Sequence, residues 1–216
     1  MSASASQSVF HIGDVKTPLG IQTFLSADSL GSSVYDQSLK KDAVYWPINT
    51  FALLFSQAID YYQHRVDTVR QLEERLSALG AQVGSRMLDH FMYNHQKTKR
   101  EQRVLAMLVL VKGPLWKYLF GKDADQLEQS NEAEGTYYII EKDAVTNRYI
   151  SASITKEKST TVERNCGAFL AGLVQSFLTD SGFACVVNAH AHKGTTLVVD
   201  FDKAVIAREK TLESTK

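Results

Sequence analysis

The sequence predicts an α+β fold in which a layer of helices packs on a four-stranded antiparallel sheet. Two observations lead to this fold class. Apolar residues recur at helical spacing between residues 46 and 121, whereas the alternating patterns typical of strands follow later, in two pairs. One further helical segment lies between these two pairs. The expected order is therefore three helices, two strands, one helix and two strands.

The chain of 216 residues is long enough to build one core, and we expect a single α+β domain over residues 46–210. Residues 1–45 are rich in Ser, Gly and Asp and show no sustained period, so they are predicted to form a flexible arm. Two apolar patches in this arm, Val9-Phe10 and Ile21–Leu25, are candidates for local docking. Residues 211–216 are expected to form a C-terminal tail.

The first helix, expected over residues 48–62, is more apolar than a helix with a single buried face needs to be. One face carries Ile48, Phe51, Phe55, Ala58, Ile59 and Tyr62. Leu54 and Tyr61 widen this face, and Leu53 lies nearly opposite it. A surplus apolar face usually marks an interface with another protein. The candidates for binding a partner are Phe51, Leu54, Phe55, Ala58, Tyr61 and Tyr62, and periodicity alone does not divide them between core and interface.

The second helix is expected over residues 68–93. It opens with Thr68-x-x-Gln71, the pattern of a capping box in which two side chains satisfy free backbone donors. Apolar residues in phase with a helix follow, and Gly80 and Gly84 interrupt them. These two glycines predict either a bend or close packing against another helix, and the missing G-x-G-x-x-G pattern argues against a dinucleotide loop.

The third helical region covers residues 101–120. Apolar residues from Val104 to Val111 occur on every face, which predicts a helix that is buried all round. Gly113-Pro114 should kink or interrupt this helix, because proline lacks the backbone donor and crowds the preceding turn.

The first pair of strands is expected at residues 136–141 and 148–153, where β-branched and aromatic residues are frequent. A helix beginning near Asn165 follows, with Gly182 as its C-terminal stop. Besides a strongly apolar stripe, this helix has small residues at intervals of four, which predict close approach of another backbone. They are Ala168, Gly172 and Ser176.

The last two strands alternate between apolar and polar residues over 183–191 and 195–201. Lys193-Gly194 between them suits a two-residue hairpin turn. This turn resembles the end of a phosphate loop, but the upstream glycine and the following helix are missing.

Composition excludes several classes of function. Lys and Arg total 24, as do Asp and Glu, so no general attraction to nucleic acid is expected. The longest apolar run is far shorter than the roughly 20 residues of a membrane-spanning helix, and no direct membrane insertion is expected. Two isolated cysteines, Cys166 and Cys185, suit a reducing compartment, and with no secretory signal at the N-terminus we expect a cytoplasmic protein.

No catalytic, cofactor or metal site emerges from the residues. His190-x-His192 is the one pair with metal-ligand spacing, but two ligands on one strand do not complete a zinc site. We therefore expect no metal, no cofactor and no enzymatic activity. The basic residues between 97 and 103 are ordinarily a solvated surface, with an acidic partner or lipid headgroups as the alternative.

Several segments taken in order resemble the Bet-three-like subunits of the TRAPP vesicle-tethering complex, most closely the branch of subunit 5. The matching segments are FALLFSQ (51–57), RLSALGAQVGSRMLD (75–89), VLVKGPLWKYLFGKDADQLEQ (109–129), TYYIIEKDAV (136–145), CGAFLAGLVQSFLTDSGF (166–183) and HKGTTLVVDFDKAVIAR (192–208). The resemblance covers about residues 48 to 210, and the ordered set is more specific than any one motif.

The resemblance implies a helical layer on a four-stranded antiparallel sheet, and pairing with related subunits through helical faces. It also implies that this chain is a non-catalytic core subunit of a complex that tethers vesicles in ER-to-Golgi transport. As a whole, that complex acts as a guanine-nucleotide exchange factor for a Rab GTPase. The resemblance places the chain in the cytoplasm, peripherally associated with Golgi and ER membranes through the complex.

One departure from the family concerns acylation. The founding Bet-three subunit carries an acylated cysteine shortly after the segment that resembles GAQVGSRMLDHF, whereas residues 94–103 contain no cysteine here. Acylation of that kind is therefore not carried over. A small-molecule or lipid-binding module, with an apolar pocket beneath residues 101–120, remains the alternative function.

Overall fold

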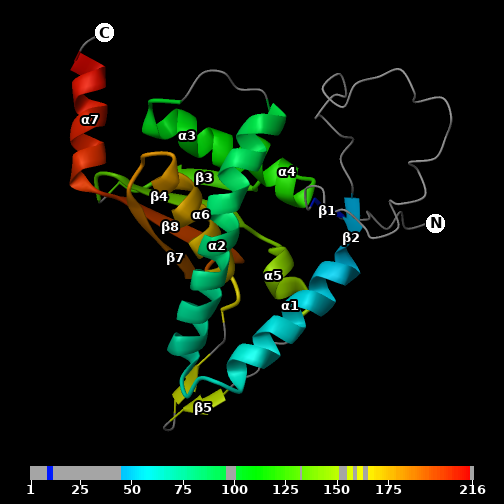
Figure 1. Cartoon of the computed structure of the whole chain (residues 1–216). Coiled ribbons are helices and arrows are strands. Elements are labelled where there is room, and N and C mark those ends of the chain that lie inside the picture. Colours follow the sequence, from blue (N-terminus) through cyan, green and yellow to red (C-terminus); the bar gives the residue numbers. More distant parts are fainter. Residues whose placement is uncertain are drawn as a thin grey trace, which may run out of the picture.

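The computed structural model describes residues 9–11, 45–95, 101–131, 133–150, 155–157, 160–162 and 165–214. Its centre is a four-stranded antiparallel sheet with the strand order β3-β4-β8-β7. The strands are β3 (Gln126–Gln129), β4 (Thr136–Glu141), β8 (Thr195–Phe201) and β7 (Cys185–His190). Helix α6 (Ala168–Asp180) covers one face of this sheet, and the long helix α2 (Val69–His95) crosses α6 on its outer side (Figure 1). The predicted fold class is confirmed.

One of the four strands is not where the sequence predicts it. Residues 148–150 do not form a strand: Arg148 ends the one-turn helix α5 (Val145–Arg148), and residues 151–153 lie outside the described part of the chain. The Ala144 carbonyl accepts hydrogen bonds from the backbone N–H groups of both Asn147 and Arg148 and so closes this turn. Strand β3 occupies the edge beside β4 instead. Its residues, Gln-Leu-Glu-Gln, have little strand propensity, so that pairing with β4 overrides local preference.

The predicted hairpin of β7 and β8 is present, but its connection is longer than two residues. Pairing ends at His190 with Thr196, so that residues 191–194 form the connection. Lys193 and Gly194 have positive φ angles of 50° and 100°. A Cβ atom on Gly194 would lie 2.7 Å from the Glu141 carbonyl oxygen, which explains why a glycine stands there.

Helices α2 and α6 pack with their backbones in close contact, as the small residues predict. A Cβ atom on Gly172 of α6 would lie 1.9 Å from the Ser77 carbonyl oxygen of α2. In the other direction, a Cβ atom on Gly80 would lie 2.0 Å from the Phe169 carbonyl oxygen, and one on Gly84 would lie 2.4 Å from that of Leu173. Larger side chains are therefore excluded from this contact.

The C-terminus of α6 and the N-terminus of α2 lie where the sequence predicts them. Gly182 has φ 87°, its N–H bonds to the Thr179 carbonyl, and the Phe183 N–H bonds to the Leu178 carbonyl, which is the Schellman arrangement. At the start of α2, Thr68 Oγ1 accepts from the Gln71 N–H at 3.3 Å. The Gln71 side chain in turn accepts from the Asp67 N–H at 3.0 Å, one residue before the expected donor. Helix α2 then continues through both glycines as one helix.

The third helical region divides into α3 (Val104–Leu110), a π-helical turn, η4 (Val111–Leu115), and α4 (Trp116–Phe120). Pro114 lies within the π-helical turn, as expected of a residue that cannot donate to the helix. The prediction that residues 104–111 are buried all round is wrong. The side chains of Leu105 and Val109 are 56% and 52% exposed, because only one side of α3 faces the core.

The remaining elements lie around this centre. Helix α1 (Ile48–Gln63) precedes α2, and α7 (Lys203–Ser214), which was not predicted, follows β8 and continues across residue 210. Two short antiparallel pairs join β1 (Val9–His11) to β2 (Tyr45–Pro47), and β5 (Thr155–Glu157) to β6 (Thr160–Val162). The rest of the predicted arm, including Ile21–Leu25, and most of the basic residues between 97 and 103 lie outside the described residues.

Candidate functional site: a protein-interaction surface on α1

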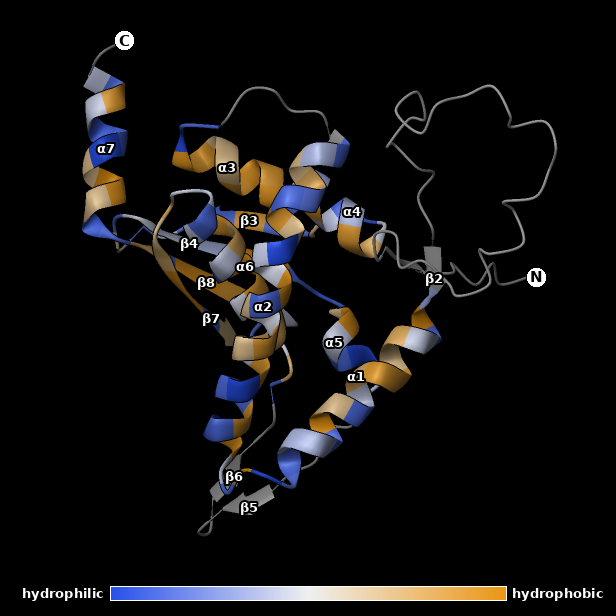
Figure 2. Ribbon diagram, in the orientation of Figure 1, coloured by the Kyte–Doolittle hydropathy of each residue, from blue (hydrophilic) through white to orange (hydrophobic). Residues whose placement is uncertain are grey.

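Helix α1 has two apolar faces, only one of which is covered. The inner face carries Phe51, Phe55 and Ile59, which are buried. On the outer face, Leu53, Leu54 and Tyr61 are 70%, 67% and 53% exposed. Figure 1 shows α1 running obliquely away from α2, with α5 beside it, and Figure 2 shows apolar residues along its length. The outer face of α1, meaning Leu53, Leu54 and Tyr61, is therefore an apolar surface without cover in the described chain.

The inner face attaches α1 to the rest of the fold. The Phe51 and Phe55 rings stack with centroids 5.4 Å apart. Phe55 also meets the Phe169 ring of α6 edge-on, at 5.3 Å. These two residues belong to the hydrophobic core. Of the six candidates for partner binding, Phe51 and Phe55 are thus buried, Ala58 and Tyr62 are half-buried, and Leu54 and Tyr61 are exposed.

The exposed aromatic ring of α1 is held in position by its neighbours. The Arg65 guanidinium lies 3.6 Å from the centroid of the Tyr61 ring and donates a hydrogen bond to the Tyr61 carbonyl oxygen at 2.9 Å. The Tyr62 ring meets Tyr61 edge-on at 5.5 Å. An ordered ring loses less conformational entropy on binding than a free one, so this arrangement favours association.

A second exposed apolar pair, not predicted from the sequence, lies on α3. Leu105 and Val109 are one helical turn apart and therefore share a face. Their spacing of four residues can be read from the sequence. Because all residues from Val104 to Val111 are apolar, however, the sequence does not indicate which of them are exposed. Figure 2 shows α3 as a largely apolar helix near the top of the molecule.

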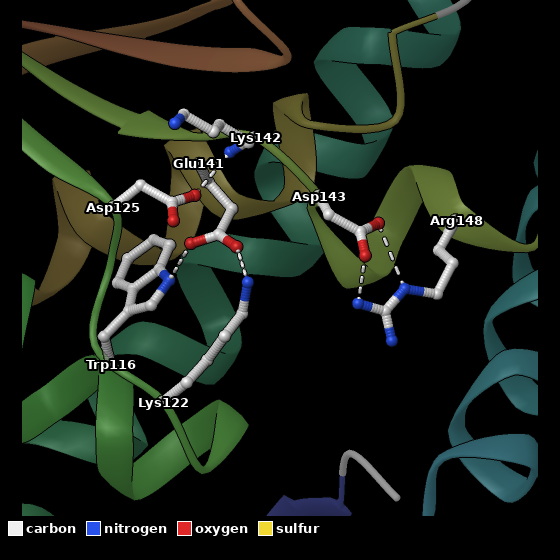
Figure 3. A network of polar contacts seen from close by, with 7 residues as sticks. All are labelled: Trp116, Lys122, Asp125, Glu141, Lys142, Asp143 and Arg148. Carbon is white, nitrogen blue, oxygen red and sulfur yellow. Dashed lines mark hydrogen bonds and ion pairs between the residues drawn. The ribbon is translucent and has the colours of Figure 1, made fainter. Parts of the chain in front are cut away.

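Polar side chains around Glu141 and beside α5 are paired with one another (Figure 3). Glu141 is 2% exposed; it accepts a hydrogen bond from Trp116 Nε1 at 3.0 Å and forms an ion pair with Lys122. Burial raises the pKa of the Glu141 carboxyl, whereas Lys122 opposes this shift. The Asp143 carboxylate accepts hydrogen bonds from the Arg148 guanidinium. These bonds are the main reason why the pKa of Asp143 is lowered. These contacts fasten β4 to α4 and close α5, which contacts α1.

The other residues singled out in the sequence lie apart from one another. His190 and His192 are exposed, and within the described residues no group of three His, Cys, Asp or Glu side chains is placed to hold a metal ion. Cys166 and Cys185 are buried free thiols, and burial raises the pKa of Cys185 to about 12. Such a thiol is unreactive at neutral pH.

Core side chains pack beneath the third helical region, where the alternative function expects an apolar pocket. Phe91 of α2 is fully buried there, with its ring 5.6 Å from Tyr118 and 5.9 Å from Phe177. Met107 and Leu108 of α3 are buried in the same core. Among the described residues, no helix is long and apolar enough to cross a membrane.

Comparisons with known proteins relate the chain to one family. Residues 51–203 match the family model described as "Transport protein particle (TRAPP) component". The chain is 47% identical to trafficking protein particle complex subunit 5 of Bos taurus over 182 residues, which are 84% of this chain and 94% of that protein. It is 36% identical to subunit 5 of Dictyostelium discoideum, over 82% of this chain and 96% of that one.

A solved structure extends the likeness to the fold. The structure is that of a trafficking protein particle complex subunit 3 from Naegleria fowleri, covalently bound to palmitic acid. It superposes with a TM-score of 0.61 at 12% sequence identity and covers 72% of this chain and 95% of that one. At this identity the match concerns the fold alone.

Proposed function

Because this chain belongs to the transport protein particle (TRAPP) component family, we propose that it is a non-catalytic core subunit of a multisubunit vesicle-tethering complex. Its contribution is assembly: the outer face of α1 binds a related subunit of the same family. The observation that carries this proposal is the exposure of Leu53, Leu54 and Tyr61 on a helix whose opposite face is already in the core.

The energetics of such a contact favour a lasting pair. Full burial of a leucine or aromatic side chain stabilises an interface by about 1.5–3 kcal/mol. Permanent interfaces are more apolar than transient ones and larger, from about 2,000 Å² of total buried surface. The outer face of α1 supplies the apolar centre of such an interface, whereas Ala58 and Tyr62 are half-buried and Tyr62 packs against the core.

The finer function belongs to the complex as a whole. We propose that the assembly acts as a guanine-nucleotide exchange factor for a Rab GTPase in ER-to-Golgi transport, and that this chain reaches Golgi and ER membranes through the complex. The chain itself supplies structure to that activity. The buried carboxylate of Glu141 is already engaged by Lys122 and Trp116, which suits a fastening role rather than a catalytic one.

Co-purification tests the proposed pairing. A tagged chain carrying Leu54→Glu and Tyr61→Glu should lose the related subunit bound through α1, because two charges replace the apolar centre of the contact. Val186→Glu is the matched control, since Val186 is 51% exposed on β7, away from α1, and its replacement should leave the complex intact. Retention of the same subunits by the α1 variant would disprove the assignment of this face.

Nucleotide exchange separates assembly from activity. The isolated chain should release no labelled GDP from the Rab GTPase, and the intact complex should accelerate release. The complex formed with the α1 variant should lose acceleration in proportion to the subunits it loses. Acceleration by the isolated chain would contradict a purely structural contribution.

A further inference from the structure

A groove of about 840 Å³ separates the first half of α2 from the edge strand β7. Its floor is formed by α6, where Ala168 and Ala171 present small side chains and Gly172 lies against the backbone of Ser77. Ala78 and Ala81 of α2 widen it from one side. Because small residues line both the floor and one wall, the groove is wide enough to receive side chains of another molecule.

The strand side of the groove is closed to a further strand. Val187 of β7 donates its backbone N–H to the Gln175 side chain at 3.0 Å. The carbonyl oxygen of Ala189 accepts a hydrogen bond from the Asn165 side chain, also at 3.0 Å. Two of the backbone groups that an added strand would need are therefore already bonded. An occupant of this groove must be recognised by its side chains.

The helix side of the groove carries two glutamates, Glu73 and Glu74. Glu74 pairs with Arg70 on the same helix at 3.2 Å. Glu73 is half-buried and accepts a hydrogen bond from the Asn165 N–H at 3.3 Å, but within the described residues no Lys or Arg forms an ion pair with it. Burial raises the pKa of Glu73, with the Asn165 N–H and the nearby His190 acting in the opposite direction. A cation placed beside this carboxylate would offset its desolvation.

We propose that the groove between α2, α6 and β7 binds a segment of another protein chain through a Lys or Arg side chain that reaches Glu73. The charge of Glu73 selects a basic residue, and the floor of Ala168 and Ala171 accommodates small apolar neighbours of that residue. The bonded edge of β7 excludes recognition by strand addition. The site is distinct from the outer face of α1, so the chain has two attachment surfaces.

Photo-crosslinking in the assembled complex tests this proposal. Benzoylphenylalanine is introduced at Ala78, which is exposed on the groove wall, and the complex is purified through a tag on this chain before irradiation. The expected product joins position 78 to a peptide of another chain that contains Lys or Arg. Adding Glu73→Gln should lower its yield by at least about fivefold, because the charge that selects the basic residue is lost. The same photoreactive residue at Arg86, exposed on α2 outside the groove, is the control.

Several results would overturn the proposal. These are a product within this chain, a product with a second copy of it, a peptide without a basic residue, a yield that Glu73→Gln leaves unchanged, and the absence of any product. Failure here is separable from failure of the pairing through α1. Ala78→Trp, which fills the groove, should release the segment bound there while the subunit held by Leu54 and Tyr61 stays, and Arg86→Trp should release neither.

Discussion

The contact between α2 and α6 and the outer face of α1 are both apolar, but they differ in the size of their side chains. Between α2 and α6, glycines bring two backbones so close that a Cβ atom on Gly172 would lie 1.9 Å from a carbonyl oxygen. On the outer face of α1, large side chains such as Leu54 stand 67% exposed. The glycines mark a contact that is already made within the chain, whereas the large exposed side chains of α1 form the surface that we propose for assembly.

The largest effect is expected at the closed contact. Gly172→Ala should destabilise the fold by more than about 3 kcal/mol, because the added methyl group overlaps the α2 backbone and one helix must move. Gly113→Ala is the matched control, since a Cβ atom there meets nothing within 4 Å. Its stability should change by less than about 1 kcal/mol, as measured by urea unfolding. Equal losses of stability at the two positions would show that the α2–α6 contact has room for a methyl group at residue 172.

A similar contrast is expected between the two faces of α1. Phe55→Ala should destabilise the isolated chain by about 3 kcal/mol, because a ring that is 4% exposed and packs on Phe169 is removed. Leu54→Ala, one residue earlier, should change its stability by less than about 0.5 kcal/mol. Urea unfolding of both variants measures the difference. A strong loss of stability in Leu54→Ala would place that residue in the core and break the distinction between the faces.

The free energy of unfolding should depend on pH through the buried carboxyl of Glu141. Burial raises the pKa of Glu141 above its ordinary value of 4.5, so the folded state binds more protons than the unfolded state between the two pKa values. Its contribution to stability is thus present below the unfolded pKa and is lost as the pH rises through the folded pKa. Glu141→Gln cannot ionise, and the stability of the wild type relative to this variant should fall as the pH rises above the ordinary glutamate pKa of 4.5. Parallel pH profiles of the two proteins would contradict this.

A small effect is also expected on α3. Leu105→Ser with Val109→Ser should change the free energy of unfolding by less than about 1 kcal/mol, because both side chains are more than half exposed. Thermal unfolding of the isolated variant measures this. A loss of several degrees in Tm would contradict the exposure of this pair.

The sequence predicted contacts made by backbone geometry better than those made by distant side chains. The Gly182 stop, the cap at Thr68 and the close approach at Gly172 each follow from a local rule, and each is present. Strand β3 was missed because Gln-Leu-Glu-Gln carries no strand signal, and residues 148–150 were misassigned because their β-branched and aromatic content did not reveal a hydrogen-bonded turn.

The interaction surfaces were predicted only in part. Periodicity showed that α1 has more apolar residues than one buried face needs, but it did not show that Phe55 is buried and Leu54 exposed. Both residues are large and apolar, and only the contact of Phe55 with Phe169 of α6 distinguishes them. The groove was invisible because its walls come from three separate segments, near residues 70–81, 165–175 and 187–191. Such a site exists only once the fold brings the segments together.

The central claim is that the outer face of α1 is covered by another subunit in the assembled complex. Hydroxyl-radical footprinting read at Tyr61 tests it most directly, because this ring is 53% exposed in the isolated chain. Tyr61 should be readily oxidised in the isolated chain and strongly protected in the complex, whereas the buried Phe51 should be protected in both. Equal oxidation of Tyr61 in the two states would contradict the claim.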